Sequence, residues 1–357
     1  MKDETYYVIQ KKDENFGLVN VPIYLSSTFR QIEPSKPIKY EYARTQNPTR
    51  EIMEEVIARI ENGNYGFLFS SGMSAIDTLL SILKPNDHIL VDIDVYGGTY
   101  RILEKLYKKF SIDVEYVDFT NLELLKKSIK DNTKMLIVET ISNPLLRTPN
   151  ISEISKIKKN ALLVVDNTFS TPYYFKPLDN GADVVIHSIT KYLSGHSDIV
   201  MGAIVVNDKS LADEVKFYQN TKGGVPSPFD LFLLSRGLKT LHIRMERHTE
   251  NAKRIVEFLR NNENVKEVIY PGYSGMVSFR IKKDVFEFTR KLKIITLGES
   301  LGGVESLLNV PYYMTHASIP ENERIKRGIT KDLIRLSVGI ENVNDLIEDL
   351  KNALSNK

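Results

Sequence analysis

ADVVIHSITKYLSGHSDIVMG, residues 182–202, decides how this chain folds. It begins with an apolar run, Ala182 to Ile186, which predicts a buried strand. It then breaks into a turn rich in hydroxyl groups that contains Lys191. Ligands of α/β sheets usually bind at the ends of strands. A lysine there can form a Schiff base with an aldehyde, provided that its pKa is lowered enough to leave a free amine.

Outward from this stretch, apolar strands alternate with amphipathic helices. The predicted strands cover residues 67–70, 88–93, 114–117, 135–139, 162–166, 184–186 and 203–206, and the predicted helices cover residues 51–62, 75–83, 99–110, 122–129 and 152–159. This alternation predicts a mainly parallel sheet with helices on both faces. The last two strands are joined by a polar loop without a crossover helix, so one of them can run antiparallel.

The chain divides into three parts. Residues 1–40 show little periodicity and are interrupted by prolines, which predicts an extended arm that lies on another surface. Residues 41–236 hold the alternating elements. Residues 237–357 form a smaller α+β domain, which begins with one long helix over residues 237–261. Its other predicted elements are strands at 265–269, 276–281 and 333–337, and helices at 285–292 and 344–352.

Composition excludes several classes of function. The chain has 357 residues and a net charge of +2, which indicates no strong attraction to nucleic acids or membranes. It has no cysteine, which rules out disulfides and thiolate catalysis. The six histidines show no metal-ligand spacing, so we assign no metal. No apolar run approaches the ~20 residues that span a bilayer, and the N-terminus is too charged for a signal peptide. We therefore expect a cytoplasmic protein.

Two groups of residues are suited to hold a phosphate. Ser71-Gly72-Met73 stands at a predicted helix start, where unpaired N–H groups and the helix dipole favour an anion. The hydroxyls of Ser188 and Thr190 flank the candidate lysine. A lysine beside a phosphate cradle suggests pyridoxal phosphate (PLP). The alternative for the first group is structural, because Ser-Gly turns often precede helices.

Three further residues match what a PLP site needs. Asp166 ends a predicted strand and could keep the pyridine nitrogen protonated, or could instead cap a turn. Tyr96 follows another strand and could stack on the cofactor ring, or could serve packing alone. Arg335 lies among apolar neighbours and could bind a substrate carboxylate, with an internal salt bridge as the alternative.

As an ordered set, these residues resemble the Cys/Met metabolism family of PLP-dependent enzymes, the transsulfuration group, over nearly the whole chain. The segments that carry the resemblance are YEYARTQNPTR (40–50), SSGMSAI (70–76), DVYGGTYR (94–101), ETISNPLLRTPNI (139–151), VVDNTFSTPY (164–173), HSITKYLSGHSDIVMG (187–202), GGVPSPFDLFLLSRGLKTLHIRME (223–246), GESLGGVESL (298–307) and RLSVGIE (335–341). The resemblance implies the type I PLP-dependent transferase fold, with a mainly parallel seven-stranded sheet and a smaller C-terminal domain.

The resemblance also implies roles at the cofactor. Lys191 would be the Schiff-base lysine and proton shuttle, Tyr96 would stack on the ring as the second catalytic residue, and Asp166 would face the pyridine nitrogen. The implied phosphate contacts are the backbone of Gly72 and Met73, the side chains of Ser188 and Thr190, and Tyr42 and Arg44 reaching the phosphate of a neighbouring subunit. A homotetramer built from dimers with shared sites is implied as well.

For the substrate, the resemblance implies carboxylate contacts from Asn143 and Arg335, with Ser300 nearby. Related β-lyases usually carry an aromatic residue where this chain has Glu299. Glu299 together with Arg101 therefore resembles cystathionine γ-synthases and γ-lyases, which act at Cγ of cystathionine or O-acylhomoserine. The alternatives are an O-acylhomoserine sulfhydrylase, a methionine γ-lyase or, outside the enzymes, a PLP-binding protein without turnover.

The chain departs from the family pattern in two places. The segment between the Tyr270-Pro271-Gly272 turn and the strand that follows is short, and the N-terminal arm is short and poorly matched. Because such segments lie near subunit contacts or the site entrance in relatives, these departures bear on assembly and substrate range rather than on fold.

Overall fold

The apolar run of residues 184–186 forms part of a central strand of a seven-stranded sheet. The computed structural model describes residues 2–10, 17–317 and 319–355. In spatial order the sheet contains β3 (Tyr65–Phe69), β9 (Gly202–Val206), β8 (Val184–Ser188), β7 (Leu162–Asp166), β6 (Thr133–Glu139), β4 (His88–Asp92) and β5 (Asp113–Val117). Strand β9 runs antiparallel to both of its neighbours, and the remaining neighbouring pairs are parallel. The predicted mainly parallel sheet with a reversed strand is thus confirmed.

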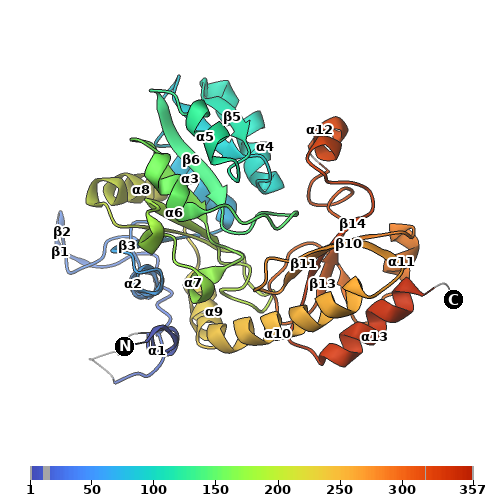
Figure 1. Ribbon diagram of the computed structural model, residues 1–357. Coiled ribbons are helices and arrows are strands. Elements are labelled where there is room, and N and C mark those ends of the chain that lie inside the picture. The colour runs from blue at the N-terminus through green and yellow to red at the C-terminus, as the bar shows by residue number, and fades with distance from the viewer. Residues whose placement is uncertain (1, 11–16, 318, 356–357) are drawn as a thin grey trace.

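Helices cover both faces of this sheet (Figure 1). The helices of the first part of the chain are α1 (Asp3–Val8), α2 (Pro48–Ile60), α3 (Gly72–Leu80), α4 (Gly97–Lys105), α5 (Leu122–Ser128), α6 (Ile151–Ile157), α7 (Thr171–Tyr174), α8 (Lys209–Lys222) and α9 (Pro228–Leu238), with 3₁₀ turns η1 (Tyr107–Phe110) and η2 (Leu178–Asn180). Within the described residues, no helix is both long enough and apolar enough to cross a membrane.

Burial on both faces explains the continuous apolar sequence of β8. Val184 and Ile186 pack in one cluster with residues of α3 and α8. Val185 points to the opposite face and packs in a second cluster with residues of α2 and α9. A strand covered on both faces has no solvent side, so it needs no alternation of apolar and polar residues.

A second sheet forms the smaller lobe. Its strands, in spatial order, are β10 (Val265–Ile269), β11 (Met276–Ile281), β14 (Leu333–Ser337), β13 (Leu307–Asn309) and β12 (Thr296–Leu297), and its helices are α10 (Leu241–Arg260), α11 (Val285–Lys291), α12 (Glu321–Lys326) and α13 (Val343–Leu354). Residues of α10, α11 and α13 share one apolar cluster with this sheet. Figure 1 shows α10 running along the base from the large lobe to the small one.

The predicted single helix over residues 237–261 is wrong at its start. Helix α9 already begins at Pro228 and ends at Leu238, and α10 starts anew at Leu241. Arg244 of α10 donates to the carbonyl of Gly237 at 2.8 Å, so a side chain satisfies the end of α9 instead of a continuing helix. Apolar side chains of both helices are still buried: Leu238, Leu241 and Met245 lie in the core of the large lobe, and Ala252, Ile255 and Leu259 in that of the small lobe.

The N-terminal arm is only partly extended. Contrary to the prediction, residues 3–8 form α1, and its Tyr7 is fully buried in the cluster that also contains residues of α2. A short hairpin of β1 (Gln31–Glu33) and β2 (Lys36–Pro37) follows. Several apolar side chains of the arm are exposed, with Val19 at 92% and Leu25 at 76%. Tyr7 and Val21 of the arm therefore belong to the core of this chain, whereas several of its other apolar side chains are exposed.

Candidate active site

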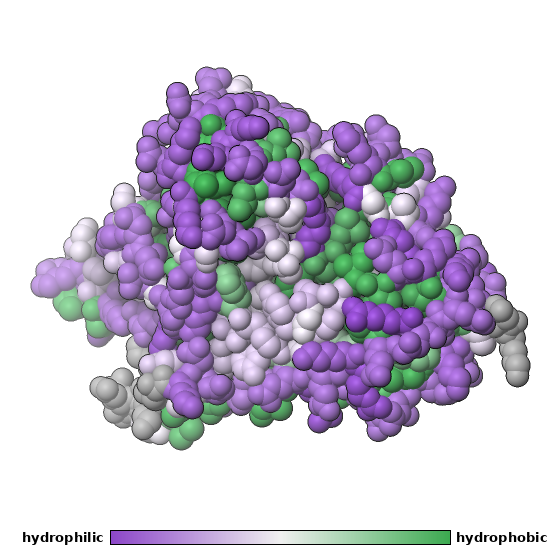
Figure 2. All heavy atoms as spheres, viewed as in Figure 1, coloured by the Kyte–Doolittle hydropathy of each residue, from purple (hydrophilic) through white to green (hydrophobic). Residues whose placement is uncertain are grey.

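A cavity of about 420 Å³ lies at the carboxyl ends of the strands of the large sheet. The first turn of α3 and loops of the small lobe complete its walls. The cavity brings together these residues predicted from sequence: Gly72, Met73, Tyr96, Asn143, Asp166, Ser188, Thr190, Lys191, Glu299, Ser300 and Arg335. Figure 2 shows a mostly hydrophilic face on which hydrophobic atoms gather in the hollow between the two lobes.

Lys191 lies in the turn that follows β8. Its backbone N–H bonds to the carbonyl of Ser188 at 3.2 Å, and its Nζ donates to Ser300 Oγ at 2.7 Å. Burial and, second to it, the charge of Arg335 lower the pKa of Lys191 to about 8, although Glu299 opposes the shift. The site therefore supplies a usable fraction of free amine near neutral pH, which a nucleophilic lysine requires.

Two buried carboxyl groups face the same cavity from neighbouring strands. Asp166 ends β7 and Glu139 ends β6, and these two residues are direct partners in the parallel ladder. Burial raises the pKa of Asp166, although the N–H of Thr168 donates to its carboxylate at 2.9 Å. Burial, and then the charge of Asp166, raise the pKa of Glu139 well above its usual value. A cation in this cavity would therefore be strongly attracted to Asp166.

The first turn of α3 meets the end of β8 at close range. Ser71 caps the helix by accepting the N–H of Ser74 at 3.0 Å. A Cβ added at Gly72 would lie 3.2 Å from the Cβ of Ser188, and one at Gly202 would lie 2.4 Å from the carbonyl oxygen of Ser71. Glycine at both positions lets the helix N-terminus approach the hydroxyl-bearing turn, where its N–H groups favour an anion.

Arg335 crosses from the small lobe into the cavity. It lies on β14 and is 2% exposed. Its guanidinium donates to Asn143 Oδ1 at 2.9 Å and to the carbonyl of Ser300 at 3.0 Å. Ser300 has a φ of +80°, a left-handed conformation that costs energy for a serine. Its two hydrogen bonds, to Lys191 and to Arg335, hold it there.

Tyr96 lies beside the cavity at the N-terminus of α4. The carboxylate of Glu139 accepts its backbone N–H at 2.7 Å. A Cβ at Gly98 would lie 2.4 Å from the Tyr96 ring and 2.9 Å from Met73 Sδ. Gly98 therefore leaves room for the ring in this position.

Three predicted site residues lie outside the lining described for this cavity. Arg101 is exposed on α4. Arg44 donates to the carbonyl of Asn220 at 2.6 Å, and its guanidinium lies 5.7 Å from the centre of the Tyr42 ring. Tyr42 is 47% exposed. Tyr42 and Arg44 thus lie at the surface beside the end of α8, outside the described lining of the cavity that contains Lys191.

Sequence reasoning missed three polar residues of the lining, Glu139, Thr168 and Thr315. Glu139 and Thr168 stand at or just after strand ends, which is the signal that led to Asp166. Thr168 Oγ1 also accepts the N–H of Ser188 at 2.8 Å, so it joins two of the strand ends. Thr315 carries no comparable signal, because only the folding of the small lobe onto the large one brings it to the cavity.

The residues present fit pyridoxal phosphate. Lys191 offers an amine of lowered pKa to an aldehyde, and the glycine-lined start of α3 with Ser188 offers a place for a phosphate. Asp166 is a buried carboxyl group whose charge a protonated pyridine nitrogen would compensate.

Comparisons with known proteins agree with this site. A model of the family described as "Cys/Met metabolism PLP-dependent enzyme" matches residues 4–355. The chain is 48% identical over 365 residues to a cystathionine beta-lyase of Lactococcus lactis subsp. cremoris, which covers 97% of this chain and 96% of the relative. It is 47% identical to a cystathionine gamma-synthase/O-acetylhomoserine (thiol)-lyase of Bacillus subtilis, over 96% of this chain and 93% of the relative.

A solved structure agrees as closely. That of cystathionine gamma-lyase from Lactobacillus plantarum, complexed with L-serine, superposes with a TM-score of 0.97 at 40% identity, over 99% of this chain and 98% of that one. The predicted type I fold and the predicted cofactor, pyridoxal phosphate, are confirmed. The chain belongs to the Cys/Met metabolism family of PLP-dependent enzymes.

Proposed function

We propose that this enzyme acts at Cγ of cystathionine or of an O-acylhomoserine, by γ-elimination or γ-replacement. The arrangement that carries the proposal is the Lys191 amine, 2.7 Å from Ser300 Oγ, in one cavity with Arg335 and Glu299. The Lys191 amine is the base, Arg335 is a fixed cation and Glu299 is a carboxylate, all in one cavity. These groups suit a substrate that carries an amino acid group at each end.

We assign the following tasks to the residues of the chain. Pyridoxal phosphate, when bound, supplies an electron sink for the charge that develops at the substrate's Cα. Lys191 removes the proton from Cα, because its lowered pKa leaves it partly unprotonated. Arg335 and Asn143 bind the α-carboxylate and orient that proton toward Lys191. Asp166 would compensate the positive charge of the pyridine nitrogen, and Tyr96 would lie against the ring.

The phosphate would be held at the start of α3. Gly72, Met73 and Ser188 all line the cavity, and a Cβ at Gly72 would lie 3.4 Å from Ser188 Oγ. Thr190 Oγ1 accepts the N–H of Met201 at 3.0 Å and donates to its carbonyl at 3.2 Å, so its hydroxyl is fixed in position. To donate to a phosphate, this hydroxyl would turn its proton from the Met201 carbonyl to the anion, while the bond from the Met201 N–H would still hold the oxygen in place.

Two observations favour Cγ chemistry over the alternatives. Glu299 lines the cavity, where an acidic side chain suits the distal amino group of cystathionine. Gly98 stands where related methionine γ-lyases usually carry a cysteine, and a Cβ there would lie 2.4 Å from the Tyr96 ring in its present position, which argues against that activity. Arg101 lies outside the described lining, so we assign it to the distal carboxylate only for a substrate that extends out of the cavity.

A second candidate is β-elimination from cystathionine, because the Lactococcus relative carries that name. A third candidate is γ-replacement with sulfide as the nucleophile, because the Bacillus relative is named as an O-acetylhomoserine (thiol)-lyase as well as a synthase. The products separate these candidates. γ-Elimination of cystathionine releases cysteine, 2-oxobutanoate and ammonia, whereas β-elimination releases homocysteine, pyruvate and ammonia. Incubation of O-acylhomoserine with cysteine or with sulfide tests the replacement reactions.

Glu299→Ala provides the mutational test. We expect a higher KM for cystathionine, by about tenfold, because one charge-assisted contact is lost, while the KM for a short O-acylhomoserine changes less. For Glu299→Gln, the KM for cystathionine should lie between that of the unaltered enzyme and that of Glu299→Ala. Equal effects on both substrates, or pyruvate as the main keto acid from cystathionine, would contradict the proposal.

We further propose a homotetramer of dimers with shared active sites. Two features support it: Tyr42 and Arg44 lie outside the described lining of the cavity of their own chain, and apolar residues of the arm, Val19, Leu25 and Ile38, are 92%, 76% and 63% exposed. A second copy of this chain would cover such exposed apolar side chains. The cytoplasmic location and the domain limits at residues 40 and 236 also remain our proposals.

A further inference from the structure

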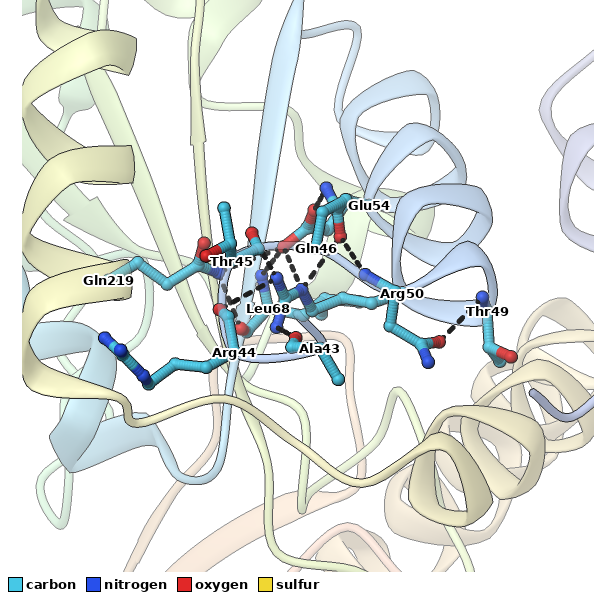
Figure 3. A network of polar contacts seen from close by, with 10 residues as sticks. Ala43, Arg44, Thr45, Gln46, Thr49, Arg50, Glu54, Leu68 and Gln219 are labelled. Carbon is cyan, nitrogen blue, oxygen red and sulfur yellow. Dashed lines mark hydrogen bonds and ion pairs between the residues drawn. The ribbon is translucent and has the colours of Figure 1, made fainter. Parts of the chain in front are cut away.

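A buried arginine lies beneath the segment that carries Tyr42 and Arg44. Arg50, in the first turn of α2, is 1% exposed. Its guanidinium donates to the carbonyls of Ala43 at 3.1 Å, Arg44 at 3.2 Å and Thr45 at 2.7 Å. Figure 3 shows these bonds converging on one side chain. The three carbonyls belong to consecutive residues, so one planar group fixes the path of the whole segment.

A second set of bonds anchors Arg50 to the large sheet. Its Nε donates to Gln46 Oε1 at 3.1 Å and lies 3.6 Å from Glu54 Oε1. Glu54 also accepts the N–H of Leu68, on β3, at 3.0 Å, and the amide of Gln219, on α8, at 3.0 Å. The segment is therefore tied through Arg50 and Glu54 to two rigid elements of the core.

The side chains of Tyr42 and Arg44 lie on the side of the segment opposite to Arg50. In Figure 3 the Arg44 side chain points away from the Arg50 network. It reaches the carbonyl of Asn220 at the end of α8, and the Thr45 hydroxyl lies 3.3 Å from Asn220 Oδ1. The network therefore uses only the backbone of the segment and leaves the Arg44 guanidinium and the Tyr42 ring facing outward.

Burial of a guanidinium is costly unless its hydrogen bonds are satisfied. Most of the acceptors of the Arg50 guanidinium are backbone oxygens of a surface segment. Its hydrogen bonds therefore stabilise the conformation of that segment more than they join elements of the core. We propose that Arg50 is a positioning residue for the cofactor site of a neighbouring subunit. It fixes residues 42–45 so that Tyr42 and Arg44 meet the phosphate bound by a second copy of this chain. The inference rests on the proposed shared site.

Mixed oligomers test the inference. Arg44→Ala and Arg50→Gln subunits are each co-expressed with Lys191→Ala subunits, and activity is measured at a PLP concentration that just saturates the unaltered enzyme. Alone, Arg50→Gln should bind PLP about 10 to 100 times more weakly, as is usual when a supporting residue is lost. Mixed randomly with Lys191→Ala, it should recover about a quarter of full activity, because half of the dimers then hold one intact site.

A buried arginine that acts within its own chain is the matched control. Arg244 is 3% exposed and donates to the carbonyls of Tyr192, Leu193 and Gly237, two of them directly after Lys191. Arg244→Gln disturbs the subunit that supplies the lysine, so Lys191→Ala subunits should not rescue it. A mixture of Arg50→Gln with Arg44→Ala should also stay inactive, because both changes affect the segment given to the partner.

The outcomes separate the inference from the function on which it rests. If Arg44→Ala is not rescued by Lys191→Ala, the shared site itself is refuted. If Arg44→Ala is rescued and Arg50→Gln is not, the site is shared and the role of Arg50 is refuted. Should Arg50→Gln fail to fold, Arg50→Lys replaces it: an ammonium keeps the charge but cannot bond three carbonyls in one plane, and the same rescue is expected.

Discussion

Replacing Arg335 by methionine changes the charge beside the reactive lysine without opening the site to water. Burial is the largest cause that lowers the pKa of Lys191 to about 8 from its ordinary 10.5, and the charge of Arg335 is the second. Burial also lowers the pKa of Arg335, to about 10, so this residue stays charged over the range in which Lys191 titrates. Arg335→Met should therefore raise the pKa of Lys191, but not to 10.5, because burial remains.

The size of the effect follows from the fraction of neutral amine. With a pKa of about 8, about one lysine in ten is neutral at pH 7; with the ordinary 10.5, only about one in 3,000 would be. The loss on removal of Arg335 lies inside this window of about 300-fold, at a factor of ten for each pKa unit. Even if the charge of Arg335 causes only a small part of the pKa shift of Lys191, its removal therefore gives a measurable change in rate.

The assay is the rate at which apoenzyme takes up pyridoxal phosphate, followed by visible absorbance across pH. For the unaltered enzyme, the rate should rise with pH and level off above about 8. For Arg335→Met, the curve should move to higher pH, with a slower rate at pH 7. Arg335→Lys is the control, because it keeps a charge near the same place while losing the bonds to Asn143 and Ser300. An unmoved or lowered midpoint in Arg335→Met would refute the assignment of the shift to this charge.

Two further predictions concern stability. Between about pH 8 and 10.5, the unfolded chain binds a proton at Lys191 that the folded chain does not, so the stability of the folded chain rises with pH in this range. Lys191→Met should therefore stabilise the apoprotein by on the order of 3 kcal/mol at pH 7 and by little above pH 10.5. Denaturant titrations at both pH values test this, and an equal gain at both would show that packing is the cause. Asp349 accepts the N–H groups of Lys293, Ile294 and Ile295 at 2.8, 3.0 and 2.9 Å, so Asp349→Ala should cost about 2–4 kcal/mol of unfolding free energy, measured by urea titration, while PLP uptake is unchanged; a normal midpoint would mean that water replaces the carboxylate.

Local patterns predicted the central elements well. The apolar run before Lys191 and the strand that ends at Asp166 both form neighbouring central strands, because each is buried on both faces. The polar loop after Lys191 correctly indicated a reversed strand. These features depend on residues close in sequence, which is why one sequence was sufficient to place them.

The prediction lacks helix α8 and the start of α9, although both helices have clear end signals in the sequence. Ser227 caps helix α9 by accepting the N–H of Asp230 at 3.2 Å, and Pro228 is its first residue. A serine followed by a proline is a typical helix start that can be read from sequence. Helix α8 likewise begins after Asp208 and ends before Gly223, whose φ is +72°. Both helices could have been predicted from their caps. Helix α8 is mostly polar, whereas α9 contains the apolar run FDLFLL, in which periodicity alone does not mark where a helix begins or ends.

The sequence by itself determined which residues could carry the chemistry. A lysine, an acid and a glycine-bordered helix start at strand ends are local facts, and the order of the motifs identifies the family. Tertiary structure decided how they act together. Only the packing of the small lobe brings Arg335 and Ser300 to Lys191, and the pKa of Lys191 is lowered by burial and by the charge of Arg335, both of which exist only in the folded chain. Only the folded surface turns Arg44 outward above Arg50, because burial and long-range contact depend on residues far apart in the chain.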